Sequence, residues 1–357
     1  MPAFTGQLKS NEIFSALYNM IISQQVFADN IKGTVATLVD AAKVDGSLYG
    51  DTKLYYATDA LKSAPWGNDA EATNLLALHR PKAPDVQAIT LDVFRQISLT
   101  VDNYLSKRAF STEGAFSEFN SVMQGWIADT KKIYDSTTYN AFMGTAASAV
   151  GKQARTINIT AAVGSTTGEE KNRLEAEAIA ENLANLMVEM SDVSRDFNDY
   201  GNLRSYSLGD VKVIWNSKFV NKIKKIDLPT IFHKDGLIDK FEQYTLPERY
   251  FGAVNTGTKQ GDGTTVRSLI EQDIGKNHYF AGDLIKSTDT APAGTSYTVN
   301  DKIICKVVTK LPPYMSAFEV GTSFFNPKSL TENHYLTFGR NTLEYLKNYP
   351  MITIKAV

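Results

Sequence analysis

Polar and apolar residues alternate more regularly between residues 89 and 101 than anywhere else in the chain. Only Phe94 and Arg95 interrupt the alternation. A period of two is typical of a β-strand whose two faces have different surroundings. The apolar positions are Ile89, Leu91, Val93, Ile97, Leu99 and Val101.

This predicted strand is long for a compact domain. At about 3.3 Å per residue it spans roughly 40 Å, whereas a compact globule of this chain's 357 residues has a radius of gyration of about 20 Å. A second strand is predicted at 53–59, and prolines and glycine interrupt the segment between the two. We therefore predict a two-stranded arm formed by residues near 53–60 and 87–102. The alternative is a long, bent central strand of an ordinary sheet.

An isolated hairpin is marginally stable in water, so we expect a neighbouring subunit to cover the apolar face of the arm. On this expectation Leu91→Asp leaves a soluble subunit that fails to assemble. For residues near the tip, the alternative is local packing inside the loop. The expected subunit contacts are Leu54, Tyr56, Ile89, Leu91, Val93, Ile97 and Leu99 in the arm, and Trp66, Leu75 and Leu76 near its tip.

Apolar spacings of three and four predict three helices. One begins after Ser111 and Thr112 and covers 112–134. Another covers 169–195, where Thr166 with Glu169 or Thr167 with Glu170 can form a capping box. A third amphipathic helix is predicted within 11–27. The residues expected to pack helix 112–134 onto a sheet are Phe116, Phe119, Met123 and Trp126.

The remaining segments favour strands. A buried strand is predicted at 211–215, and residues 253–300, rich in Gly and Thr, are typical of a loop-bearing β insertion. Strands follow at 303–309, 334–338 and 351–356. Because helices and strands mix without a regular βαβ repeat, the predicted fold class is α+β.

Composition removes several classes of protein. The 37 Lys and Arg nearly balance 39 Asp and Glu, so the net charge of −2 gives no general attraction to nucleic acid or an anionic membrane. The single cysteine, Cys305, excludes an intrachain disulfide and a cysteine-cluster metal site, and fits a reducing cytosol. The apolar stretch around Ile21 and Ile22 is too short and too polar to indicate a signal peptide or a membrane span.

No motif indicates an enzyme. Gly151-Lys152-Gln153 and Gly275-Lys276-Asn277 lack the hydroxyl that follows lysine in a phosphate-binding loop. The four histidines lie far apart in the sequence, and Cys305 alternates with apolar residues as a core residue does. We expect no catalytic residue, no cofactor and no metal site.

Several segments resemble the major capsid proteins of short-tailed bacteriophages. The resemblance covers most of the chain from about residue 50 and rests on segment patterns rather than on a diagnostic motif. The closing run 333–357 is consistent with it. The segments that carry it are VDNYLSKRAF (101–110), GAFSEFNSVMQGWIADTKKIYD (114–135) and RDFNDYGNLRSYSLGDVKVIWNSKFVNKI (195–223).

The resemblance implies the Hong Kong 97-type capsid fold. That fold has an N-terminal arm, an extended β-hairpin loop, a peripheral domain with a long spine helix, and an axial domain. The corresponding ranges are 1–50 for the arm, 51–105 for the loop, 106–140 and about 301–340 for the peripheral domain with spine helix 112–134, 141–300 for the axial domain with the β insertion 253–300, and 341–357 for a C-terminal strand.

The resemblance also implies a function. Such a protein is structural and self-assembles into hexamers and pentamers of an icosahedral shell around double-stranded DNA. It is found in the virion and is assembled in the bacterial host cytoplasm. The implied partners are other copies of the chain, a portal protein, a scaffolding protein and weakly, non-specifically bound DNA, with no membrane. The alternatives are an encapsulin-like cellular compartment, or a ligand- or carbohydrate-binding protein built on the β-rich 253–310 region.

Overall fold

The computed structural model describes residues 37–47, 50–63, 78, 80–102, 113–148, 150–220, 242–256, 295–299 and 302–357. The helix predicted within 11–27 lies outside these residues. The chain divides into two compact units that interleave along the sequence. Unit 1 comprises Met1–Asp51, Leu91–Thr137 and Met315–Asn341, and unit 2 comprises Thr52–Thr90, Thr138–Tyr314 and Thr342–Val357.

Unit 1 contains a sheet built mainly from the second half of β3 (Asp85–Asp102), β10 (Tyr314–Asn326) and β11 (Thr331–Asn341). β11 pairs antiparallel with β10 on one side and with β3, from Leu91 to Asp102, on the other. The predicted arm of 87–102 is therefore wrong in its extent, because residues 91–102 pair with β11 and not with residues 53–60. The short elements α2 (Thr37–Ala42) and β1 (Lys43–Asp45) also belong to this unit.

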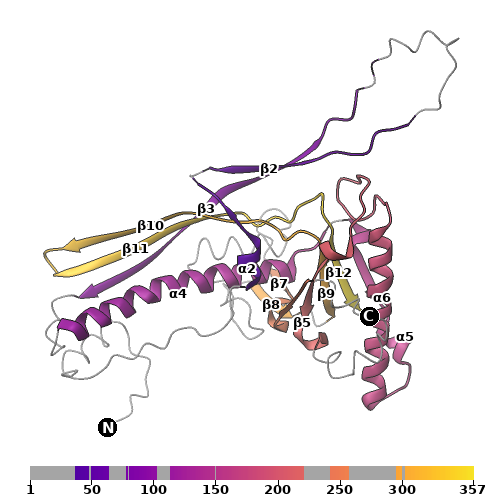
Figure 1. Ribbon diagram of the computed structural model, residues 1–357. Coiled ribbons are helices and arrows are strands. Elements are labelled where there is room, and N and C mark those ends of the chain that lie inside the picture. The colour runs from indigo at the N-terminus through magenta and orange to yellow at the C-terminus, as the bar shows by residue number, and fades with distance from the viewer. Residues whose placement is uncertain are drawn as a thin grey trace. The chain divides into compact units, whose positions relative to one another are not determined.

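The long helix α4 (Glu113–Thr145) packs on one face of the unit 1 sheet (Figure 1). Tyr134 is the centre of the contact: the Arg95 guanidinium lies 5.6 Å from its ring centre, and Arg340 Nε donates a 3.0 Å hydrogen bond to its hydroxyl. Phe338 meets the same ring edge-on at 5.6 Å between centres. Residue Met123 is buried as predicted.

Two expectations for this helix need correction. Trp126 is 52% exposed, so it lies away from the sheet rather than in the core. The helix continues to Thr145 instead of ending at residue 134, because its last turns bury apolar side chains in unit 2. Phe116 and Phe119 lie within α4, but their side chains are outside the described ones. The buried apolar residues of the last turns are Tyr139, Ala141, Phe142 and Met143.

Unit 2 is built on a five-stranded sheet in the order β4, β12, β9, β5, β6. β9 pairs antiparallel with β12 and β5, whereas β4 with β12 and β5 with β6 are parallel pairs. The bounds are Ala154–Ile157 for β4, Lys212–Asn216 for β5, Glu242–Leu246 for β6, Ile303–Val308 for β9 and Met351–Ala356 for β12.

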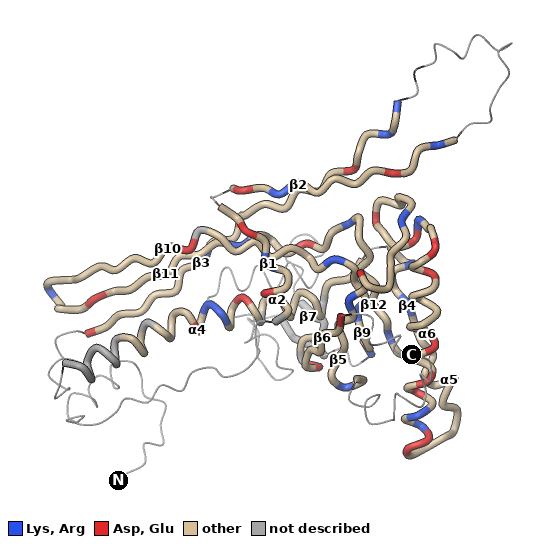
Figure 2. Tube along the Cα trace, viewed as in Figure 1, with Lys and Arg blue, Asp and Glu red and all other residues tan. Residues whose placement is uncertain are grey.

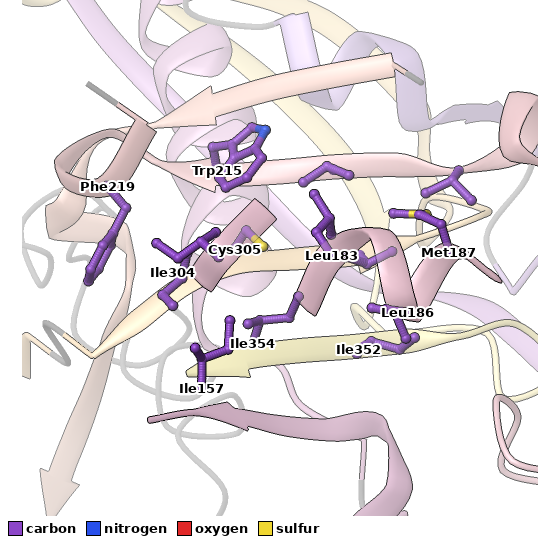
Figure 3. Packing of buried hydrophobic residues seen from close by; sticks show 14 of the residues in the cluster. Ile157, Leu183, Leu186, Met187, Trp215, Phe219, Ile304, Cys305, Ile352 and Ile354 are labelled. Atoms are coloured by element: carbon purple, nitrogen blue, oxygen red, sulfur yellow. The ribbon is translucent and has the colours of Figure 1, made fainter. Parts of the chain in front are cut away.

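The helix α6 (Gly168–Ser191) covers one face of this sheet and forms the main core of unit 2 (Figure 3). Leu183, Leu186 and Met187 of the helix pack over Cys305 and Ile352 of the strands. The outer surface of α6 mixes acidic and basic positions (Figure 2), with Arg173 paired to Glu170 and Glu177. The predicted capping box is absent: Thr167 is the N-cap residue but makes no capping side-chain hydrogen bond.

Shorter elements complete unit 2. The helix α5 (Ile159–Val163) begins at Asn158, whose side chain accepts a 2.8 Å hydrogen bond from Ala161 N. β7 (Gly252–Thr256) and β8 (Thr295–Val299) pair as an antiparallel ribbon at the two ends of the Gly- and Thr-rich segment, whose residues between them lie outside the described ones. Three 3-10 helices are formed by Gly151–Gln153, Leu208–Asp210 and Glu248–Tyr250.

Lys306 is a fully buried amine in the middle of β9. Its Nζ donates a hydrogen bond to the carbonyl of Ala146, directly after the last residue of α4. A lysine at this place suits the negative end of a helix. Burial, with a smaller contribution from the charge of Lys355, lowers the pKa of Lys306 to about 7.

β2 (Thr52–Ala57) forms a hairpin with residues 85–90 of β3, and one face of this hairpin is packed within unit 2. The buried Gln87 side chain donates to Tyr345 O at 3.0 Å and accepts from Lys347 N at 2.9 Å. On the same face, Lys310 Nζ lies 5.4 Å from the ring centre of Tyr55. One residue thus satisfies two backbone groups of segment 342–349 and fixes the hairpin to it.

We expect Lys306→Met to flatten the pH dependence of stability. Unfolded lysine, with its usual pKa of 10.5, binds a proton between about pH 7 and pH 10.5 that folded Lys306 lacks. In that window the wild-type free energy of unfolding therefore rises with pH by up to about 1.4 kcal/mol per unit. Urea denaturation of both proteins at several pH values measures the slope. Identical slopes would show that Lys306 is not a buried titrating amine.

We expect Gln87→Leu to destabilise unit 2 by about 1–3 kcal/mol, because it removes two hydrogen bonds between a buried side chain and the backbone at Tyr345 and Lys347. Gln96→Leu is the matched control on the same strand. Gln96 is exposed and bonds only the Thr337 hydroxyl among the described contacts, so its loss should change stability by less than about 0.5 kcal/mol. Urea denaturation midpoints test the difference, and equal midpoints contradict the anchoring role of Gln87.

Candidate subunit-contact surface

The face of the β2–β3 hairpin that lies opposite Gln87 and Tyr55 exposes apolar side chains. Leu54 lies opposite Ala88, and Tyr56 lies opposite Val86. Leu54 is 51%, Tyr56 63% and Val86 47% exposed. We call these four residues the hairpin face. Exposed apolar side chains gathered on one surface are typical of a site that another protein covers.

The sequence of β2 explains why the hairpin has two apolar faces. Side chains of a strand alternate between its faces, so Leu54 and Tyr56 point one way, and Tyr55 and Ala57 the other. Strands with apolar residues on both faces are characteristic of sheets that are covered on both sides. Unit 2 covers the side of Tyr55, and the hairpin face remains exposed among the described residues.

Two of the residues expected at subunit contacts, Leu54 and Tyr56, lie on the hairpin face. Ile89 and Leu91 are 2% and 1% exposed, so they are core residues and not contacts with a neighbour. The expectation that Leu91→Asp leaves a soluble subunit is therefore wrong, since a carboxylate there would be buried without a partner. Ile89 and Leu91 lie on the same face of β3 as Gln87, whose side chain bonds segment 342–349.

Val93, Ile97 and Leu99 are half-buried and lie on the face of β3 that carries Arg95. Arg95 contacts Tyr134 of α4, so this face turns toward the chain's own helix. That a second subunit covers the part of these three residues that is still exposed stays a prediction. The expected tip contacts Trp66, Leu75 and Leu76 lie outside the described residues.

Sequence reasoning missed other exposed apolar residues. Val86 precedes the predicted strand start at 87, although the apolar–polar–apolar order of Val86, Gln87 and Ala88 could have extended the strand. A second group lies around the turn between β10 and β11, where no strand was predicted before residue 334. This group, which we call the β10–β11 turn, comprises Phe324, Phe325 and Leu330, all exposed.

The described residues offer no site for metal or thiol chemistry. Among them, no group of three or more His, Cys, Asp or Glu side chains is placed to hold a metal ion. Cys305 is fully buried in the unit 2 core, and burial raises the pKa of its thiol. Within the described part of the chain, no helix is long and apolar enough to cross a membrane.

Comparison with solved structures shows the fold. The capsid structure of Staphylococcus phage Andhra matches with a TM-score of 0.63 at 10% identity, covering 100% of this chain and 94% of that one. A chain from the structure of the head fiber and inner core protein of native bacteriophage P68 matches with a TM-score of 0.61 at 11% identity, covering 99% and 95%. The predicted α+β fold class is confirmed by these mixed helix-and-strand neighbours.

Comparison of the sequence itself gives the family. No curated protein matches the chain. The family model described as Phi29-like phage major capsid protein matches residues 5–351. The predicted resemblance is confirmed, and the chain belongs to the Phi29-like phage major capsid protein family.

Proposed function

We propose that this capsid protein assembles into hexamers and pentamers, and that the hairpin face is a surface through which one copy contacts the next. The family makes the chain a structural component of an icosahedral phage capsid. The observation that supports the finer proposal is the exposed apolar strip of Leu54, Tyr56 and Val86 on a hairpin whose opposite face is already anchored.

The energetics of the hairpin face suit reversible assembly. Full burial of a large apolar side chain contributes about 1.5–3 kcal/mol. The side chains of the strip are already half covered, and association itself costs free energy, so a single contact of this size is weak. A ring of subunits makes the contact repeatedly, and the contacts reinforce one another once the ring has closed. Weak single contacts also allow a misplaced subunit to dissociate.

A closed shell needs more than one kind of contact. A heterologous contact repeated around one axis closes into a ring and goes no further. Contacts around a second axis must join the rings. The β10–β11 turn, with Phe324, Phe325 and Leu330 exposed, is the described apolar surface of unit 1 that supports this role.

The proposal extends to the arrangement and partners expected from the sequence. In the Hong Kong 97-type arrangement, the β2–β3 hairpin corresponds to the extended loop, α4 to the spine helix, and the sheet of unit 2 with α6 to the axial domain. The shell encloses double-stranded DNA, and the net charge of −2 favours weak, non-specific contact with it. A portal protein and a scaffolding protein complete the assembly, which takes place in the bacterial cytoplasm.

We expect the double variant Leu54→Asp/Tyr56→Asp to fold but to lose assembly. Two apolar contacts of about 1.5 kcal/mol each are worth about a 100-fold change in the concentration needed for assembly. Light scattering and negative-stain microscopy measure assembly, and circular dichroism checks the fold.

Val188→Asp is the matched control, because Val188 is 69% exposed on α6 rather than on the hairpin. It should leave assembly unchanged. Shells formed by the double variant at the wild-type concentration would exclude the hairpin face as a contact. A wild-type protein that forms no shell, alone or with its neighbouring genes, would contradict the proposed assembly itself.

A further inference from the structure

The chain continues beyond the hairpin without a β ladder to guide it. Pairing between β2 and β3 ends at Ala57 and Asp85. The described residues on either side of the loop, 58–63 and 80–84, form no strand. The direction of the described loop residues 58–63 and 80–84 must therefore be set by other contacts.

Those contacts come from one turn of unit 2, residues 194–204. Arg195 Nη1 donates to Asp59 Oδ2 at 2.7 Å, and Leu203 N donates to Asp59 Oδ1 at 3.0 Å. Arg204 Nη2 donates to Thr58 O at 2.6 Å. Both carboxylate oxygens of Asp59 are thus held by the same turn, which fixes the side chain in position as well as in orientation.

The returning chain is held by the same turn. Asn202 Nδ2 donates to Asp85 Oδ2 at 3.2 Å. Residues 202–204 therefore contact both segments of the loop, the outgoing one at 58–59 and the returning one at Asp85, where the pairing of β2 with β3 ends. Attachment of both segments resists rotation of the loop, which a single contact would permit.

The turn itself is rigid. Ser194 and Arg204 exchange two backbone hydrogen bonds of 3.0 Å. The buried Asn198 side chain donates to Asn202 O at 2.6 Å and accepts from Asn202 N at 2.9 Å. Gly201, at φ +66°, makes the left-handed step that this turn requires, and its carbonyl also accepts from Arg195 Nη1.

The electrostatics agree with this geometry. The Leu203 N–H, followed by the Arg195 guanidinium, holds the pKa of Asp59 well below its usual range. The carboxylate therefore stays charged at any pH at which the protein is handled. The Asp59–Arg195 pair is nevertheless accessible to solvent and salt, in contrast to the buried Gln87 anchor.

We propose that Asp59 and Arg195 are positioning residues that set the angle of the extended loop and thereby the curvature of the shell. The inference rests on the proposed function, in which the hairpin and its loop contact a neighbouring copy. Gln87 fixes the hairpin to unit 2, and the Asp59–Arg195 pair fixes the direction of the loop beyond it. Loss of the pair leaves the hairpin face intact but lets the loop meet its neighbour at several angles.

The test compares Asp59→Ala with Asp196→Ala. Asp196 lies in the same turn and forms an exposed ion pair with Lys152 at 2.6 Å, but makes no described contact with the loop. Hydrogen exchange of a peptide containing Leu203, measured on subunits below their assembly concentration, should become about tenfold faster in Asp59→Ala. It should remain unchanged in Asp196→Ala.

Negative-stain microscopy gives the second readout. Asp59→Ala should form shells and open sheets of mixed curvature, whereas Asp196→Ala should form shells of one diameter. Arg195→Gln removes the same pair from the other side, without changing the loop, and should reproduce the mixed curvature. Asp59→Ala also removes the bond from Leu203 N, and Arg195→Gln also removes the bond to Gly201 O, so the two variants share only the loss of the ion pair. The double variant Asp59→Ala/Arg195→Gln should show the same mixed curvature, because the ion pair can be lost only once.

Each outcome decides for or against the pair as a positioning element. Shells of uniform diameter from both Asp59→Ala and Arg195→Gln overturn the inference, as does unchanged exchange at Leu203. If the wild-type protein forms no shell, the proposed function fails. The inference about curvature then fails with it, while the exchange experiment still shows whether Asp59 holds the turn.

Discussion

The register of β3 is the constraint on which the rest of the structure depends. A strand alternates its side chains with a period of two, so the registers in which β3 pairs with β2 at 85–90 and with β11 at 91–102 determine which side chains face inward. Ile89 and Leu91 turn into the chain, and Val86 and Ala88 turn out of it. A slip of one residue would bury the hairpin face and expose the core positions.

Polar groups, more than apolar ones, hold the hairpin in that register. A projecting hairpin has little apolar surface to bury within its own chain, and isolated hairpins are marginally stable. Gln87 compensates by satisfying two backbone groups of segment 342–349, which makes the pairing specific. A buried side-chain amide with both ends paired specifies one arrangement where an apolar contact would tolerate several.

The sequence predicted local features better than long-range pairings. The alternation of 89–101, the helix at 169–195 and the strand at 351–356 are strong local patterns, and the structure has elements there. The partner of the long strand could not be predicted, because Thr331–Asn341 lies more than 200 residues away and β10 includes Gly321 and a run of Thr and Ser.

The errors have the same origin. Trp126 matched the apolar spacing of α4, yet periodicity alone does not determine which side of a helix meets a sheet. The end of α4 was placed too early, because its last turns depend on packing within unit 2 rather than on helix propensity. Ile89 and Leu91 were wrongly expected at a contact for a related reason: the hairpin has apolar residues on both faces, and the alternation does not tell which face the chain itself buries.

Under the proposed function, the different roles of Gln87 and Asp59 follow from what assembly demands of a subunit. The base of the hairpin must survive every encounter with a neighbour, so it is held by a buried group with two backbone partners. The loop beyond it must keep one direction and yet yield during docking, and a solvent-accessible ion pair suits that need because its energy is modest and its making and breaking are fast. A buried ion pair would bind more rigidly but would cost desolvation each time it re-formed. Strength at the base and reversibility in the loop are therefore separate physical requirements, and this chain meets them with different chemistry at Gln87 and at Asp59.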